Sequence, residues 1–176
     1  KLSDAEKKEI QTIIKIVDDA AAGQPAANDL SLTYLHDDLL KSQGNKQYVP
    51  FSITVDPSKI TGGRVGLYWR LVSKDAPAPA ASGKADDKKA APVKPAYEDL
   101  HTVNVAADQK NPMRISRSFT VGPGSYDLFI VAKEPAPEKP KKGDPTPKWS
   151  LIKQSVTVPD LWNGELNTSS VIVADR

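Results

Sequence analysis

The chain has 176 residues, a formal net charge of +2 and no cysteine. This length suits one domain that buries its own core, and the lack of cysteine excludes disulfides and thiolate-bound metals. Much of the lysine lies in two segments rather than on one folded face, which argues against nucleic-acid binding. No apolar run approaches the ~18 residues that a membrane-spanning helix needs, so we expect no membrane span.

Residues 1–25 carry the pattern of a helix. Ser3 and Glu6 fit a capping box, which satisfies free N–H groups in the first turn. Gly23 and Pro25 end the helix. Between them, apolar residues recur on one helical face at Ile10, Ile13, Ile14 and Val17. We expect this face to pack on the rest of the chain; the alternative is that it packs on an upstream domain or a partner.

From residue 30 the apolar period changes to two, which is typical of strands with one buried face. Strands are expected at 30–41, 49–55, 64–73, 97–106, 115–121, 126–132, 149–158 and 169–174. Turn signals separate these runs and no helical crossover intervenes, so antiparallel pairing in two layers is favoured. The sequence therefore predicts a mainly β protein, an antiparallel immunoglobulin-like β-sandwich of about 7–8 strands over residues 28–176 with an N-terminal helix.

Two residues predict local features of this sandwich. Pro50 cannot donate to a ladder, so its strand should have an edge or a bulge there. Tyr126 follows the glycine-proline-glycine corner at 122–124. Immunoglobulin-like sandwiches place a tyrosine at such a corner, and its hydroxyl bonds back to the backbone. A half-buried strand tyrosine without this bond is the alternative.

Two tracts rich in alanine, proline and lysine, at 75–96 and 134–148, interrupt pairs of strands. They have almost no large apolar side chains to offset the entropy of ordering, so we expect long flexible loops within one domain. Counted from residue 30, three strands separate the tracts. We therefore expect the tracts to leave opposite ends of the sandwich.

No motif for catalysis or for a metal ion rises above background. His36 and His101 lack an accompanying G-x-S-x-G nucleophile and are expected to be exposed strand residues. Neighbouring carboxylates on a strand point to opposite faces, so they form no acid–base pair. We expect no enzyme activity, no metal and no cofactor, with calcium held between loops as the remaining alternative.

Tryptophans are the remaining candidates for binding. Trp69 alternates with apolar residues and is expected in the core. Trp149 opens a strand after the second tract, and Trp162 lies in a turn. An exposed tryptophan can stack on a sugar ring or anchor a protein partner. The alternative for Trp162 is that it closes the open end of the core.

Several short sequence segments of the chain resemble a known group of proteins. They are VDDAAAGQ at 17–24, NDL at 28–30, YVPF at 48–51, VGLYWR at 65–70, VPDL at 158–161 and SSVIVADR at 169–176. Together they resemble the C-terminal β-sandwich region of exported acidobacterial-type proteins, described as von Willebrand factor A-related or as GWxTD-domain proteins. The metal motif D-x-S-x-S and the GWxTD word are absent. The resemblance implies an exported accessory module and carries over no binding residue.

These observations favour a non-catalytic exported module that acts in scaffolding, assembly or protein–protein interaction. Edge strands would allow pairing with a partner protein or with a second copy. The chain starts at Lys1 rather than at a methionine, from which we expect a processed or excised piece whose signal peptide is already removed. The alternative function is a carbohydrate- or ligand-binding sandwich that uses exposed aromatics, so a glycan is a further candidate partner.

Overall fold

The computed structural model describes residues 3–75, 94–106, 108–137 and 143–171. Within these residues the protein is mainly β, with eight strands in two antiparallel sheets and one N-terminal helix, as the sequence predicts. Most of the first tract, the middle of the second and residues 172–176 lie outside the described residues. The expected flexibility of the two loops therefore stays a prediction.

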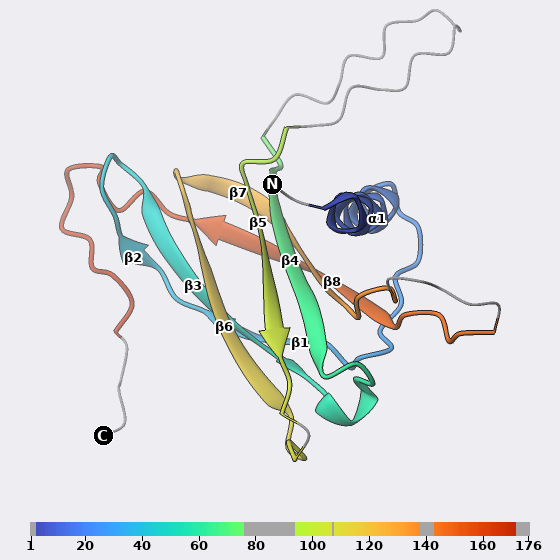
Figure 1. Ribbon diagram of the computed structural model, residues 1–176. Helices are drawn as coiled ribbons and strands as arrows, with labels where there is room; N and C mark the ends of the chain where they lie inside the picture. Colours follow the sequence, from blue (N-terminus) through green and yellow to red (C-terminus); the bar gives the residue numbers. More distant parts are fainter. Residues whose placement is uncertain (1–2, 76–93, 107, 138–142, 172–176) are drawn as a thin grey trace, which may run out of the picture.

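The strands form two sheets that face each other (Figure 1). In the first sheet, β3 (Gln47–Val55) pairs on one side with β1 (Thr33–Asp37) and β2 (Leu40–Lys41), and on the other with β6 (Met113–Val121). The second sheet has the order β5-β4-β7-β8, made by β5 (Tyr97–Asn104), β4 (Arg64–Ser73), β7 (Gly124–Lys133) and β8 (Trp149–Val158). A short 3-10 helix, η1 (Pro57–Lys59), lies between β3 and β4.

Alternate side chains of both sheets fill a common core. Phe51 and Trp69 come from opposite sheets and meet edge to face, with ring centroids 6.0 Å apart. Phe119 of β6 lies at the same distance from Phe51. Trp69 is buried here, as its alternation with apolar residues predicts.

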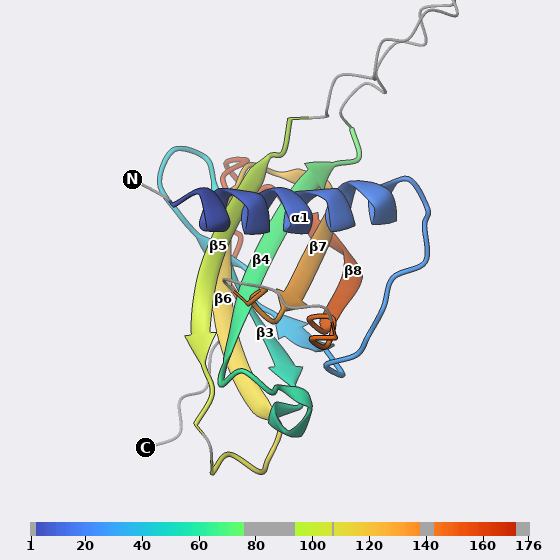
Figure 2. The ribbon, with the colours of Figure 1, turned by 45° about the vertical axis from the view of Figure 1, so that its right-hand side comes forward.

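Helix α1 (Asp4–Ala21) covers the outer face of the second sheet (Figure 2). The capping box forms, because Ser3 and Glu6 each accept from the other's backbone N–H. Ile13 and Val17 are buried, and the sheet residues that pack in the same cluster are Tyr68, Phe129, Val131 and Leu151. The expected packing of the helix on the rest of the chain is confirmed. Among the described residues, no helix has the length and apolar character needed to cross a membrane.

Pro50 lies in the central strand of its sheet, so the expected edge strand is wrong, while an irregularity does occur at this position. The carbonyl of Pro50 accepts from the N–H of Asp38, which lies between the end of β1 and the start of β2. A residue's N–H and C=O point to the same side of a strand. The missing N–H of Pro50 therefore faces the partner strand, and that partner is broken into β1 and β2 at this point.

The corner before β7 forms as the first alternative predicts. The hydroxyl of Tyr126 donates to the carbonyl of Gly122 at 3.0 Å. The register of β4 and β7 also places the two tracts. Ser73, at the end of β4, pairs with Tyr126, and Lys133, at the end of β7, pairs with Gly66. The strand ends from which the tracts leave therefore lie at opposite ends of the sheet, as expected.

The expected last strand at 169–174 is wrong for its described part, because Ser169–Val171 is not a strand. The segment still lies beside the β1–β2 edge. The N–H of Ser170 donates to the carbonyl of Leu39, whereas the N–H groups of Leu39 and Lys41 donate to the hydroxyls of Ser170 and Ser169. Side-chain oxygens thus replace the carbonyls that a ladder needs. Residues 172–174 lie outside the described residues.

Candidate binding site

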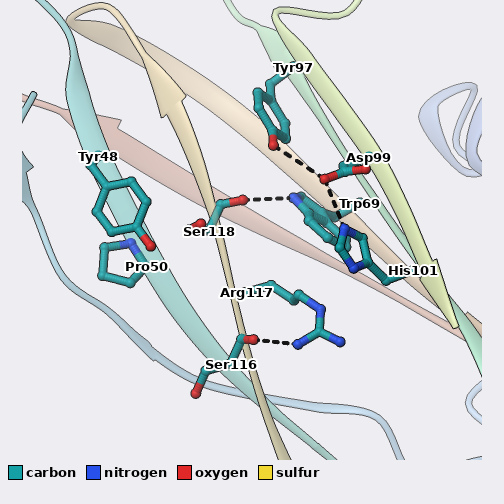
Figure 3. Close-up of a pocket in the computed structure, with 9 residues that line it drawn as sticks. All are labelled: Tyr48, Pro50, Trp69, Tyr97, Asp99, His101, Ser116, Arg117 and Ser118. Carbon is teal, nitrogen blue, oxygen red and sulfur yellow. Dashed lines mark hydrogen bonds and ion pairs between the residues drawn. The ribbon is translucent and has the colours of Figure 1, made fainter. Parts of the chain in front are cut away.

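The two sheets leave a groove on their open side, where β6 of the first sheet faces β5 of the second (Figure 3). Its cavity has a volume of about 310 Å³. Strands β3 and β6 of the first sheet and β4 and β5 of the second contribute to the region, and we call it the open-side groove. It is lined by Tyr48, Pro50, Trp69, Tyr97, Asp99, His101, Ser116, Arg117 and Ser118.

Arg117 reaches the groove because of its position in β6. It stands between Ile115 and Phe119 in the alternation that points to the core. At the open side of the sandwich an inward-pointing arginine can reach past the core to solvent. Its Nη1 donates to the carbonyl of Ser116 at 2.7 Å, and its Nε is buried without a hydrogen-bond partner among the described residues.

The floor of the groove is the indole of Trp69. Its Nε1 donates to the carbonyl of Ser118 at 3.1 Å, a bond that joins the two sheets. The ring of His101 lies over it, with the centroids 5.3 Å apart. These contacts fix the floor, so the groove is formed before any ligand arrives.

Asp99 supplies the negative charge of the groove. One oxygen accepts from the N–H of Leu100 at 2.8 Å, and the other lies 3.2 Å from Nε2 of His101 and 3.5 Å from the hydroxyl of Tyr97. Burial, and then the carboxylate of Asp99, raise the pKa of Tyr97 above its ordinary 10.0. Tyr97 therefore stays a neutral donor at physiological pH.

Tyr48 forms the rim, on the outer face of β3. Its side chain is 40% exposed, which makes it one of the few large apolar residues on this surface. Pro50 lies beside it, and Ser116 and Ser118 continue the outer face toward the groove. The rim is therefore an aromatic and hydroxyl surface, whereas the interior contains Asp99 and Arg117.

Side chains cap both strands that border the groove. Arg117 and Trp69 occupy the carbonyls of Ser116 and Ser118 on β6, and the carboxylate of Asp99 occupies the N–H of Leu100 on β5. Capping of this kind disfavours the addition of another strand. The groove is therefore suited to side chains or ligand groups rather than to an extended strand.

The two predicted site residues do not line the open-side groove. Trp162 is 48% exposed and lies against the β2–β3 turn, where its Nε1 donates to the carbonyl of Lys46 at 3.2 Å. The ammonium of Lys41 lies 5.3 Å from its ring centroid. Leu161, not Trp162, is buried at this position. Trp149 packs beside α1 in the cluster under the helix.

The histidines lie where the sequence predicts, half-exposed on β1 and β5. Within the described residues, no three acidic or histidine side chains gather as a metal site would require. The alternation alone does not bring together the groove residues Tyr48, Tyr97, Asp99 and Arg117. One feature of the sequence did indicate the groove, because Arg117 occupies a position of its strand where the alternation calls for an apolar residue.

Comparisons of the chain with models of protein families, with curated proteins and with solved structures found no match. A functional interpretation therefore rests on the residues of this chain.

Proposed function

We propose that this chain is a non-catalytic, exported binding module of the immunoglobulin-like type, which binds a partner protein in the open-side groove. The observation that carries the proposal is the difference between the two outer faces. Helix α1 covers the second sheet, whereas the first sheet bears the exposed Tyr48 and leads directly into the groove.

Two features support the immunoglobulin-like type. Apart from the two-residue β2, three strands lie in the first sheet and four in the second. Strands β4 and β7 pair at the centre of the second sheet. A tyrosine at the start of the next-to-last strand closes the preceding corner through its hydroxyl, as Tyr126 does. The resemblance to exported acidobacterial-type proteins supports the exported location.

The composition of the groove supports a protein partner. Tyrosine and arginine are enriched among residues that dominate binding energy at protein interfaces, and the groove offers Tyr48 and Arg117. Serine supplies adaptable hydrogen bonds beside such anchors. The capped backbone groups disfavour pairing along the edge, so the partner would insert side chains. That partner is either another protein or a second copy of this chain.

A glycan is the second candidate, and the polar set inside the groove favours it. Asp99 and His101 lie beside Tyr97, and the ring of Tyr48 borders the groove across β6. This combination of rings and polar groups suits a hydroxyl-rich ring that stacks and forms hydrogen bonds. The volume of about 310 Å³ lies at the lower end of small-ligand pockets, which span about 300–1,000 Å³.

A selection from a random peptide library on the immobilised chain tests the proposal, together with sedimentation equilibrium over a range of protein concentrations. We expect peptides whose affinity falls at least about tenfold when Tyr48→Ser removes the rim, or self-association that the same change abolishes. Arg117→Gln should lower the affinity of acidic peptides more than that of neutral ones, because it removes a positive charge from the groove. A glycan array on the same protein tests the second candidate.

The matched control is Leu35→Ser, which removes another exposed apolar residue of the first sheet that does not line the groove. It should leave binding unchanged. If peptides bind equally to all variants, or if neither peptides nor self-association depends on the groove, the proposed protein-binding role is wrong.

A further inference from the structure

A second hollow lies at the other side of the molecule, under the C-terminal end of α1. Its volume is about 340 Å³. The last turns of the helix, the segment that follows them and the first residue of β8 enclose it. It is lined by Ile16, Asp19, Ala20, Gln24, Pro25, Ala26 and Trp149.

Trp149 is the largest side chain of this hollow. Its indole N–H differs from those of the other two tryptophans in its hydrogen bonding. The Nε1 of Trp69 donates to Ser118 and that of Trp162 donates to Lys46. The Nε1 of Trp149 has no hydrogen-bond partner among the described residues, and it is not one of their buried unsatisfied atoms. The indole N–H is therefore accessible to solvent, and the ring lines the hollow.

Two carboxylates and the C-terminal end of a helix lie at the hollow. The hollow lies at the C-terminal end of α1, where the helix dipole favours cations, and the last turn has no basic residue. Asp19 lines the hollow. A carboxylate oxygen of Asp29 accepts from the backbone N–H of Trp149 at 3.4 Å. Lys15 pairs with Asp19, but both side chains are at least half exposed, and exposed pairs of this kind are weak.

We propose that this hollow binds an organic cation, an alkylammonium or guanidinium group carried either by a small molecule or by a lysine or arginine of another protein. The apolar walls of Ile16, Ala20 and Pro25 receive the alkyl part. The ring of Trp149 and the carboxylate of Asp19 receive the charge, because a cation is attracted to the face of an indole. This site is separate from the open-side groove and does not depend on the function proposed for it.

Titrations of the full chain with choline and with its neutral isostere 3,3-dimethyl-1-butanol test the charge requirement. Tryptophan fluorescence in a Trp162→Phe background removes the signal of the other exposed indole. We expect saturable binding of choline, and binding of the neutral isostere weaker by about tenfold. N-acetyl-lysine-N-methylamide serves as the probe for a protein-borne cation, and tighter binding of this probe than of choline would identify a protein source.

Two variants localise the site. Trp149→Leu also removes the fluorescent reporter, so its binding is measured by isothermal titration calorimetry, and it should abolish binding. Asp19→Asn, which keeps the shape, should weaken binding about threefold. Circular dichroism checks that both variants remain folded, and Tyr48→Ser in the open-side groove should bind the cations normally. Equal binding of choline and the neutral isostere, no binding of any cation, or unchanged binding by Asp19→Asn would each overturn the proposal.

Discussion

Arg70 on β4 donates from Nη1 to the carboxylate of Asp18 on α1 at a distance of 2.7 Å. Its Nε donates to the hydroxyl of Tyr68, which in turn donates to Glu98. The side chain of Arg70 is 11% exposed, whereas that of Asp18 is 52% exposed. Burial alone would lower the pKa of Arg70, but Tyr68 and Asp18 outweigh it and raise the pKa. A buried charge thus depends on a residue of the helix.

Asp18→Asn should lower the free energy of unfolding by about 1 kcal/mol, because it removes one of the two charges that compensate Arg70. The other, the carboxylate of Glu98, lies 3.5 Å from Nη2 of Arg70 and stays. Urea unfolding measures the difference. Asp19→Asn is the matched control, since the Asp19–Lys15 pair is exposed, and it should change the stability by less than about 0.5 kcal/mol. Equal effects of the two changes would contradict this account of the helix contact.

Ile13→Ala should destabilise the protein by about 3 kcal/mol, because it opens a cavity between α1 and the outer face of the second sheet. Ile13 is buried in that contact. Gln11→Ala, on the exposed side of the same helix, should change the stability by less than about 0.5 kcal/mol. Thermal and urea unfolding give both values. A small effect of Ile13→Ala would mean that the helix does not stabilise the sheet.

Tyr126→Phe should cost about 1 kcal/mol, because it removes the hydrogen bond to the carbonyl of Gly122. Gly124→Ala should cost more. Gly124 has a φ of +149°, and an added Cβ would lie 3.4 Å from the hydroxyl of Tyr126. Both changes act on one corner, so the double variant should be less destabilised than the sum of the two. Full additivity, measured in urea, would show that the corner is not one unit.

Glu134 predicts a loss of stability in acid. Glu134 is 5% exposed. Its carboxylate accepts from both the N–H and the hydroxyl of Thr61 and from the N–H of Lys148. Burial alone would raise the pKa of Glu134, but these bonds outweigh it and lower the pKa below 4.5. The carboxylate therefore stabilises the fold above pH 4.5, and this contribution is lost as the pH falls through the lowered value.

In the measurement, Glu134→Gln should be less stable than the wild type at neutral pH by about 2 kcal/mol, because it weakens bonds to buried N–H groups. The gap should shrink as the pH falls from about 6 to about 3. Urea unfolding across this range gives the gap directly. A gap that stays constant with pH would show that the charge of Glu134 is not involved.

Gln47→Met should leave the stability unchanged or raise it by up to about 1 kcal/mol, since replacing unsatisfied polar atoms with apolar ones of similar shape removes a desolvation cost. Gln47 is fully buried at the start of β3, and neither polar atom of its side chain has a partner among the described residues. Calorimetric unfolding measures the change. A loss of more than about 2 kcal/mol would point to a structural water bound by Gln47.

The fold was predictable because apolar alternation marks strands directly. The runs at 64–73 and 149–158 match β4 and β8 residue for residue. The edge at 30–41 was less predictable, because its break depends on Pro50, which lies in the neighbouring strand. The run at 169–174 failed in its described part because the serine hydroxyls of Ser169 and Ser170 take the N–H bonds of the edge.

The groove was not predictable in the same way. Tyr48, Asp99 and Arg117 lie on three strands, and only the stacking of two sheets brings them together. Strand alternation gives the face on which a side chain lies, but not which edge strands of two sheets meet. The same limit applies to Trp149, because its hollow is closed by the end of a helix that is far away in sequence.

The central pairing of β4 and β7 also fixes the distance between the strand ends from which the two tracts leave. From Tyr126, opposite the start of the first tract, to Lys133, at the start of the second, β7 advances seven residues, or roughly 23 Å at the rise of a strand. Polypeptides fused into the two tracts would therefore be joined to the sheet at opposite ends. The sandwich is thus a spacer with two attachment points, and an insertion in the second tract preserves the fold when Glu134 and Lys148 at its ends are kept.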